Sequence, residues 1–304
     1  MIILDLTRRR LSHGAPTLAV IRAAPGAAVN AFNPHCTYQN RDLVRVYYWA
    51  VLHDRPTTWA CDRRHWPLHA RKKPLPSPAV MSRRLRSPSV RDLLARLQRD
   101  VLCPHGDPPL VWLVDGKGLP IGGASSDRQA GYSKAAGGKA KGYKLHALVG
   151  SDGSLPVWRL APMNKDERVM ARRLVRQAQL QGYRVGDAAF DDNALHDVCL
   201  AQGELQLVTP RRYRKAKGKG HHRHSPGRLR GLEILDSPCP QFGRGLLRQR
   251  RAIERYFGNL TSFGGGLGPL PAWVRTHRRV HRWVQAKLVF NALRMQLRNQ
   301  TYVA

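Results

Sequence analysis

Acidic residues are scarce in this chain. There are 20 Asp and Glu against 52 Lys and Arg, which gives a formal net charge of +32. Such an excess predicts a polyanionic partner, with nucleic acid favoured over an anionic membrane surface or a role in solubility alone. The 40 Arg outnumber the 12 Lys, which suits bidentate binding of phosphate and guanine, although a GC-rich genome raises the Arg content as well.

Long apolar runs are missing too. No stretch approaches the ~20 residues of a membrane span, because the best candidate, residues 43–52, is short and contains Arg45. Residues 1–10 hold too short an apolar run before their arginines for a secretory signal. These absences predict an intracellular protein without membrane contact.

Cysteine pairs that would mark a zinc knuckle or a redox couple are absent as well. The five cysteines are odd in number, scattered along the chain and never spaced as Cys-x-x-Cys. Hydrophobic residues still make up 42% of 304 residues, enough for a substantial core. The length suggests two modest domains or one large domain with an appendage.

Apolar spacing predicts that residues 40–102 are all helical. Asn40 is expected to cap the first helix, and Ser77 followed by Pro78 to cap a second, shorter one. A third helix follows over residues 88–101, with apolar residues on one side. The short middle helix carries Arg83, Arg84 and Arg86. Its position between two apolar helices is compatible with a helix-turn-helix in which the arginines face DNA, and equally with a solvated surface helix.

An alternation of strands and helices begins at residue 110. The apolar run at residues 110–114 predicts a buried strand that Asp115 ends, and a second strand ends at Asp187. We expect the other elements as follows: a hairpin at residues 143–149 and 155–160, a strand at 205–208, and helices at 166–179, 191–201, 246–260 and 276–298. This pattern predicts an α/β domain. The basic segment 211–230, with Arg211 and Arg212, is expected to be a flexible loop that tracks phosphates.

Three acids stand out in this basic chain. Glu254 is the only acid after residue 236, and Arg250 and Arg251 precede it by one turn. A surface ion pair worth a few tenths of a kcal/mol explains Glu254 alone, and strand-end caps explain Asp115 and Asp187 singly. Taken together, carboxylates at neighbouring strand ends and on a following helix can hold two divalent cations roughly 3.5–4 Å apart, the arrangement that catalyses in-line attack on a phosphodiester.

Four segments resemble the DDE transposases of bacterial insertion sequences, in the group whose last acid lies in a Tyr-x2-Arg-x3-Glu-x6-Lys signature. The segments are Val114-Asp115-Gly116-Lys117, Lys141-Gly142-Tyr143-Lys144-Leu145-His146, Gly186-Asp187-Ala188-Ala189-Phe190-Asp191 and Arg250-Arg251-Ala252-Ile253-Glu254-Arg255-Tyr256-Phe257-Gly258. The resemblance covers roughly residues 110–298. It implies a ribonuclease H-like fold, a mixed sheet flanked by helices, with Asp115, Asp187 and Glu254 as the catalytic, metal-binding acids.

The chain departs from this family pattern at several positions. Leu247 and Thr261 stand where the signature has Tyr and Lys, which removes two DNA contacts. In the second motif, usually Asp-x-Gly-Tyr-Asp, Ala189 and Phe190 replace Gly and Tyr, and we expect the trailing Asp191 to cap the next helix. The spacing up to Glu254 leaves little room for the large β-domain that some relatives insert.

The resemblance therefore predicts a transposase, with a helical DNA-binding region over residues 1–105 and a catalytic domain over residues 106–304. It would use two Mg²⁺, with Mn²⁺ as a substitute, to cleave phosphodiester bonds at insertion-sequence ends and join the 3′-hydroxyl to target DNA. Its expected partners are double-stranded terminal inverted repeats, target DNA and a second copy of the chain, in the bacterial cytoplasm at the nucleoid. The predicted DNA contacts are Arg83, Arg84, Arg86, Lys144, Arg211, Arg212, Arg250 and Arg251. His146, on the same face as Lys144, is expected to be a packed strand histidine.

Two alternatives stay open at this point. One is a DNA-binding protein derived from a transposase without catalytic activity. The other is a ribonuclease H-like nuclease that cuts DNA but does not transpose.

Overall fold

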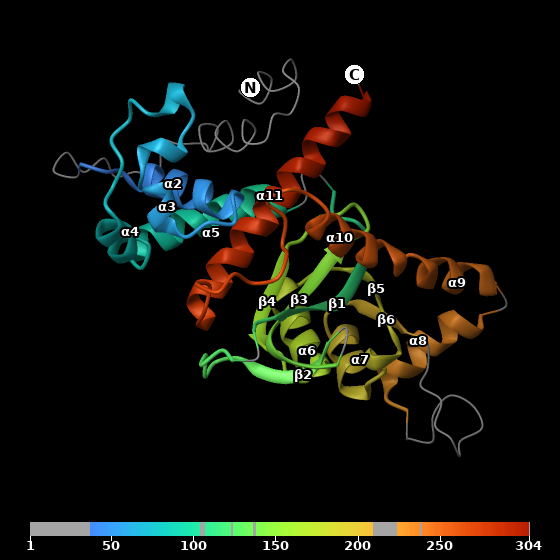
Figure 1. Cartoon of the computed structure of the whole chain (residues 1–304). Coiled ribbons are helices and arrows are strands. Elements are labelled where there is room, and N and C mark those ends of the chain that lie inside the picture. The colour runs from blue at the N-terminus through green and yellow to red at the C-terminus, as the bar shows by residue number, and fades with distance from the viewer. Residues whose placement is uncertain are drawn as a thin grey trace. The chain divides into compact units, whose positions relative to one another are not determined.

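The computed structural model describes residues 37–103, 107–122, 124–135, 138–208, 224–237 and 239–303. Figure 1 shows the chain coloured from its N-terminus to its C-terminus. The described residues group into two compact units. The first contains the described residues of the ranges Met1–Leu102, Leu260–Trp273 and His281–Ala304, and the second those of Cys103–Asn259 and Val274–Val280. Within the described helices, none combines the length and the apolar character that a membrane crossing requires.

The described part of the first unit is helical, as predicted for residues 40–102, whereas residues 1–36 lie outside the described part of the chain. Its elements are α2 (Asn40–Leu52), α3 (Thr57–Ala60), α4 (Pro78–Arg84), α5 (Pro88–Leu102), the short 3-10 turns η2 (Arg63–His65) and η3 (Leu68–Ala70), and most of α11 (His277–Val303). Ser77 caps α4 as expected, since its hydroxyl accepts from the amide of Val80 at 3.3 Å. The cap of α2 is Gln39 rather than Asn40, in a capping box with Asp42.

A buried lysine joins three segments of the first unit. Lys287 of α11 is fully buried, and its ammonium donates to the carbonyl oxygens of Val51 and Gly265 at 2.8 and 2.7 Å. It also donates to the Asp54 carboxylate at 2.8 Å. The ammonium thus ties the C-terminal end of α2, whose Val51 carbonyl oxygen also accepts from the amide of Asp54 at 3.2 Å, to the segment around Gly265.

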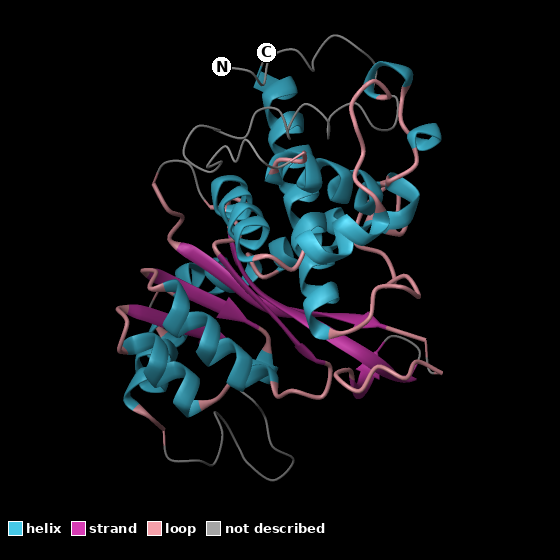
Figure 2. Cartoon of the chain, turned by 90° about the vertical axis from the view of Figure 1, so that its left-hand side faces the viewer, coloured by secondary structure: helices cyan, strands magenta, loops and turns pink. Residues whose placement is uncertain are grey.

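The second unit contains a mixed sheet of six strands. They are β1 (Val111–Pro120), β2 (Gly131–Ala135), β3 (Gly138–Gly150), β4 (Val157–Pro162), β5 (Gly182–Gly186) and β6 (Glu204–Val208). The order is β2-β3-β1-β5-β6, with β4 also paired to β3. The first half of β3 pairs with β2 and the second half with β4, both antiparallel, whereas β1, β5 and β6 run parallel. The strands are magenta in Figure 2.

Alternation along β1 gives this sheet two faces of different character. The core face carries Trp112 and Val114, which are buried in a cluster with Leu148. This cluster also holds residues of α6 (Glu167–Ala178) and α7 (Asn193–Leu200). Because successive side chains of a strand point to opposite faces, Asp115 lies on the other face, which we call the acid face. The sheet flanked by helices confirms the predicted α/β class.

Three details of the predicted elements were wrong. Strand β1 does not end at Asp115 but continues to Pro120, paired with β3 throughout. The helix expected at residues 246–260 is two helices, α9 (Pro240–Arg248) and α10 (Arg251–Thr261). Helix α8 (Pro226–Asp236) occupies the end of the predicted basic loop, and residues 209–223 of that loop lie outside the described part of the chain.

Candidate active site

Asp115 lies in the middle of β1, opposite Ala147 of β3. Its carboxylate accepts a hydrogen bond from the amide of Gly116 at 2.7 Å. The strand passes straight through this point because Gly116 has no side chain. A Cβ atom there would lie 2.9 Å from Cδ of Lys144 on the core face. Glycine therefore marks close cross-strand packing next to the acid, not the turn that the sequence indicated.

Asp187 follows the last residue of β5 and lies level with Asp115. The parallel register pairs Leu113 with Val185, and Asp115 and Asp187 are each two residues further along their strands. The two acids are neighbours, since the charge of Asp187 raises the pKa of Asp115. The Asp187 carboxylate is held by the amide of Ala189 at 2.8 Å, at the start of the short 3-10 turn η4 (Ala188–Phe190).

The surroundings of Asp115 oppose its ionisation. Burial is the main reason that the pKa of Asp115 is raised from 3.8 to about 6. The hydrogen bond from Gly116 lowers it, the negative charges of Asp187 and Glu167 raise it, and the charge of Lys144 lowers it again. Two carboxylates side by side are unfavourable without a cation, and carboxylate oxygens are the ligands that Mg²⁺ takes in proteins. The donor set of Asp115 and Asp187 thus fits a hard divalent cation.

Glu254 lies on the first turn of α10 and is largely exposed. Its carboxylate is 4.0 Å from a guanidinium nitrogen of Arg250, and the side chains are 64% and 46% exposed. One turn further on, the ring of Phe257 lies near Lys117, whose ammonium is 6.0 Å from the ring centroid. Lys117 is two residues beyond Asp115 on β1 and so shares the acid face. Helix α10 therefore contacts this face beside Asp115.

The structure brings Asp115 and Asp187 together but does not complete a three-acid site. Within the described part of the chain, no three His, Cys, Asp or Glu side chains are grouped so that they could hold a metal ion. Glu254 as the third acid stays a prediction.

A family model for the transposase DDE domain matches residues 106–286, which is more than half of the chain. The chain belongs to this family. The match confirms the predicted family and, with the mixed sheet, the ribonuclease H-like fold class. It leaves the Tyr and Lys positions of the signature untested. No curated protein matches the chain significantly.

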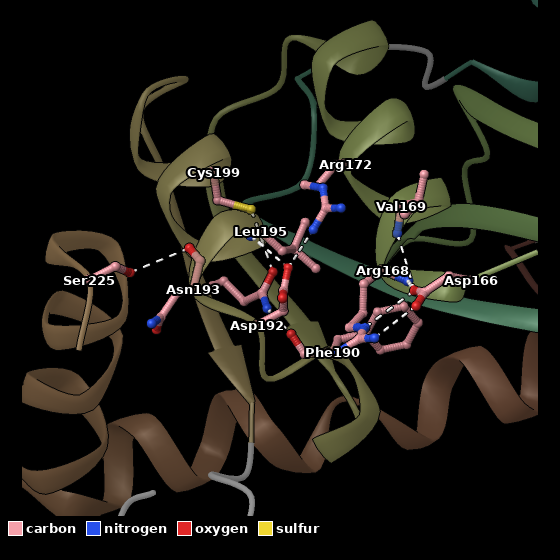
Figure 3. A network of polar contacts seen from close by, with 11 residues as sticks. Asp166, Arg168, Val169, Arg172, Phe190, Asp192, Asn193, Leu195, Cys199 and Ser225 are labelled. Atoms are coloured by element: carbon pink, nitrogen blue, oxygen red, sulfur yellow. Dashed lines mark hydrogen bonds and ion pairs between the residues drawn. The ribbon is translucent and has the colours of Figure 1, made fainter. Parts of the chain in front are cut away.

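The segment after Asp187 is fixed by a polar network that the sequence did not reveal. Asp191 does not cap α7; Asp192 does, accepting from the amide of Leu195 at 3.2 Å. Arg172 of α6 donates to Asp192 at 2.5 Å, and Figure 3 shows this link between the two helices. These contacts hold the chain just after the second acid of the DDE pattern.

Asp191 is instead buried against Arg228 of α8. The Arg228 guanidinium donates two hydrogen bonds to the Asp191 carboxylate in a bidentate contact, from Nε to Oδ1 at 2.8 Å and from Nη2 to Oδ2 at 2.9 Å. Nε2 of His196 lies 3.4 Å from the same carboxylate. The position in the motif pointed to Asp191, but nothing in the sequence pointed to Arg228, which lay within the supposed basic loop.

Lys144 is on the core face, opposite to the acid face that carries Asp115. Its ammonium pairs with Glu167 at the start of α6, so a phosphate contact there would have to compete with this carboxylate. His146 lies beside it and is buried, as predicted. Burial first, and then the charge of Lys144, lower the pKa of His146 to about 4, so that the ring is neutral at pH 7.

The predicted DNA-contact arginines differ in their surroundings. Arg83 is exposed on α4, whereas Arg84 donates to the side chain of Asn40 at 2.9 Å and Arg86 to the hydroxyl of Ser82 at 2.8 Å. Arg251 is exposed beside Arg250 at the start of α10. Arg211 and Arg212 lie outside the described residues.

Proposed function

We propose that this member of the DDE transposase family cleaves phosphodiester bonds at the ends of an insertion sequence and joins the freed 3′-hydroxyl to target DNA. One observation carries the proposal. Asp115 on β1 and Asp187 directly after the adjacent strand β5 lie close enough for the charge of Asp187 to raise the pKa of Asp115, in surroundings that disfavour two carboxylates without a cation. On an otherwise very basic chain, such a pair of carboxylates is better explained by binding a cation that contacts a phosphodiester than by a structural role.

The pair would hold Mg²⁺, or Mn²⁺ in its place, with Glu254 as a further ligand from α10. Two such ions would activate the attacking oxygen and stabilise the leaving one. The protein fixes Asp115 through β3 and the amide of Gly116, and Asp187 through the amide of Ala189. The Glu254 side chain can reorient towards a cation at little cost, because its carboxylate is exposed and weakly paired.

The surrounding basic residues would bind double-stranded DNA, both the terminal inverted repeats and the target. Arg250 and Arg251 precede Glu254 and would contact the backbone near the cut, and Arg83, Arg84 and Arg86 would contribute from the helical unit. We infer a homodimer on paired ends, because two ends must be joined to one target. A monomeric complex that joins both ends would refute the dimer.

The test is cleavage and joining of DNA that carries the ends of the element, with Asp115→Asn and Asp187→Asn compared with the wild type. Each substitution keeps the side-chain size but removes a charged oxygen ligand, so we expect cleavage to fall by at least about 10³-fold while DNA affinity is retained. Wild-type cleavage without joining would indicate a nuclease that does not transpose. DNA binding without cleavage by any of the three proteins would indicate a binding protein, and would overturn the proposal.

A further inference from the structure

The β2–β3 hairpin carries three lysines and one tyrosine on a single face. The antiparallel register places Tyr132 opposite Lys141, and Lys134 opposite Lys139. Residues opposite or two apart on a hairpin share a face. The contacts agree, since the ammonium groups of Lys139 and Lys141 lie 5.6 and 5.8 Å from the centroid of the Tyr132 ring.

This hairpin face continues the acid face of the sheet. Lys141 is an even number of residues before Ala147 on the same strand, and Ala147 is the cross-strand partner of Asp115. Six residues along a β-strand span about 20 Å, and Lys139 lies two residues further out. At 3.4 Å per base pair, 20 Å corresponds to about six base pairs of duplex. Lys117 lies on the acid face between Asp115 and the hairpin.

Few acidic side chains neutralise the charges of the three hairpin lysines. Lys141 donates to the carbonyl oxygen of Ser125 at 2.7 Å, and its charge helps to lower the pKa of Asp127. Within the described ranges, Lys134 and Lys139 form no ion pair, and both are exposed. Like charges directly opposite on neighbouring strands destabilise a hairpin. The repulsion between Lys134 and Lys139 therefore destabilises the hairpin in the free protein, and a polyanion bound to this face would remove that repulsion.

We propose that the hairpin face formed by Tyr132, Lys134, Lys139 and Lys141 binds the phosphate backbone of the DNA duplex about six to eight base pairs from the scissile phosphate. The proposal rests on the proposed function for the position of that phosphate. Lys134 and Lys139 contact phosphates, and the exposed ring of Tyr132 packs against the backbone between the ammonium groups. Duplex DNA fits because it carries regularly spaced negative charges that the lysines of this face can neutralise.

The experiment measures binding of full-length protein to duplexes with EDTA present, so that the result does not depend on cleavage. The test variant is Lys134→Gln/Lys139→Gln. The control is Lys165→Gln/Arg176→Gln, which removes two exposed positive charges from the turn before α6 and from α6, the helix that packs on the core face. Duplexes extend about 4 or about 12 base pairs from the cleavage position, on the transposon side in one series and on the flanking side in the other.

We expect the hairpin variant to bind the long duplex about tenfold more weakly than the wild type, with a salt dependence about two units less steep, since each lost phosphate contact removes about 0.9. The control variant should lose clearly less. The wild type should bind the longer duplex more tightly than the shorter one in either the transposon-side or the flanking-side series. That series identifies which side of the cleavage position lies on the hairpin. The hairpin variant should bind its long and short duplexes with equal affinity.

Equal affinities and salt slopes for the hairpin variant and the wild type would overturn the proposal, as would equal losses in the hairpin and control variants. Tighter binding to single-stranded RNA than to the duplex, with the same lysine dependence, would also overturn it. The wild type could fail to cleave DNA while its duplex binding still depends on the hairpin lysines. That result would contradict the proposed function but support the hairpin inference.

Discussion

Loss of Arg228 should destabilise the second unit more than loss of any exposed arginine. Arg228 and Asp191 are almost completely buried, with side chains 7% and 5% exposed, and a bidentate contact joins the guanidinium to the carboxylate. In Arg228→Ala the carboxylate stays buried while its partner is removed. Breaking a buried pair in this way costs about 3–5 kcal/mol.

Denaturant unfolding of the full-length protein measures this cost. Arg230→Ala is the matched control on the same helix, since Arg230 is 67% exposed in its pair with Glu233 and should cost less than about 1 kcal/mol. Arg228→Lys should fall between the two, because lysine keeps the charge but lacks the planar fork. The double variant Asp191→Asn/Arg228→Gln should cost less than Arg228→Ala, because no bare charge remains. An Arg228→Ala protein as stable as Arg230→Ala would refute the reasoning.

Two further residues give stability predictions. Burial lowers the pKa of His146 to about 4 in the folded chain. Between about pH 6.5 and pH 4 the unfolded chain therefore binds a proton that the folded chain does not, so the free energy of unfolding should decrease as the pH is lowered from about 6.5 to about 4. The loss should reach at most about 3 kcal/mol, and His146→Gln should abolish it in unfolding experiments at pH 5 and 7.5; an unchanged pH dependence would contradict the assignment. Lys287→Met should destabilise the first unit by about 1–3 kcal/mol, because the carbonyl oxygens of Val51 and Gly265 and the half-exposed Asp54 carboxylate lose a charged hydrogen-bond donor, whereas Lys72→Met at an exposed position should not. Equal stability of the two methionine variants would count against the role of Lys287.

The sequence predicted elements well wherever caps and apolar spacing agreed, as for α4, α5 and α6. It failed at α8 although Ser225 and Pro226 repeat the signature of Ser77 and Pro78. Helix α8 packs through glycine backbone rather than an apolar stripe: a Cβ at Gly231 would lie 2.4 Å from the carbonyl oxygen of Gln206. Periodicity of apolar residues cannot reveal a helix that is packed in this manner.

The candidate site was predictable in part. Asp115 and Asp187 each follow a stretch that was predicted to be a strand, and these two strands are parallel neighbours in the sheet. The proximity of the two acids therefore followed from the predicted order of strands and helices. The continuation of β1 past Asp115 was hidden, because Gly116 mimics a turn while serving close packing against Lys144. Glu254 depends on how α10 lies against the sheet, a tertiary contact through Phe257 and Lys117 that residue spacing does not encode.

The most direct test of the central claim uses a supercoiled plasmid that carries the element's own ends, with Mg²⁺, with Mn²⁺ and with EDTA. It compares the wild type with Glu254→Gln and with Glu233→Gln. The two glutamates are matched, since both are exposed to a similar extent, 64% and 62%, and each pairs with an arginine three or four residues before it. We expect metal-dependent nicking and joining by the wild type and Glu233→Gln, and neither by Glu254→Gln. Equal activity of the two variants would show that Glu254 is an ordinary surface residue and would contradict the three-acid site.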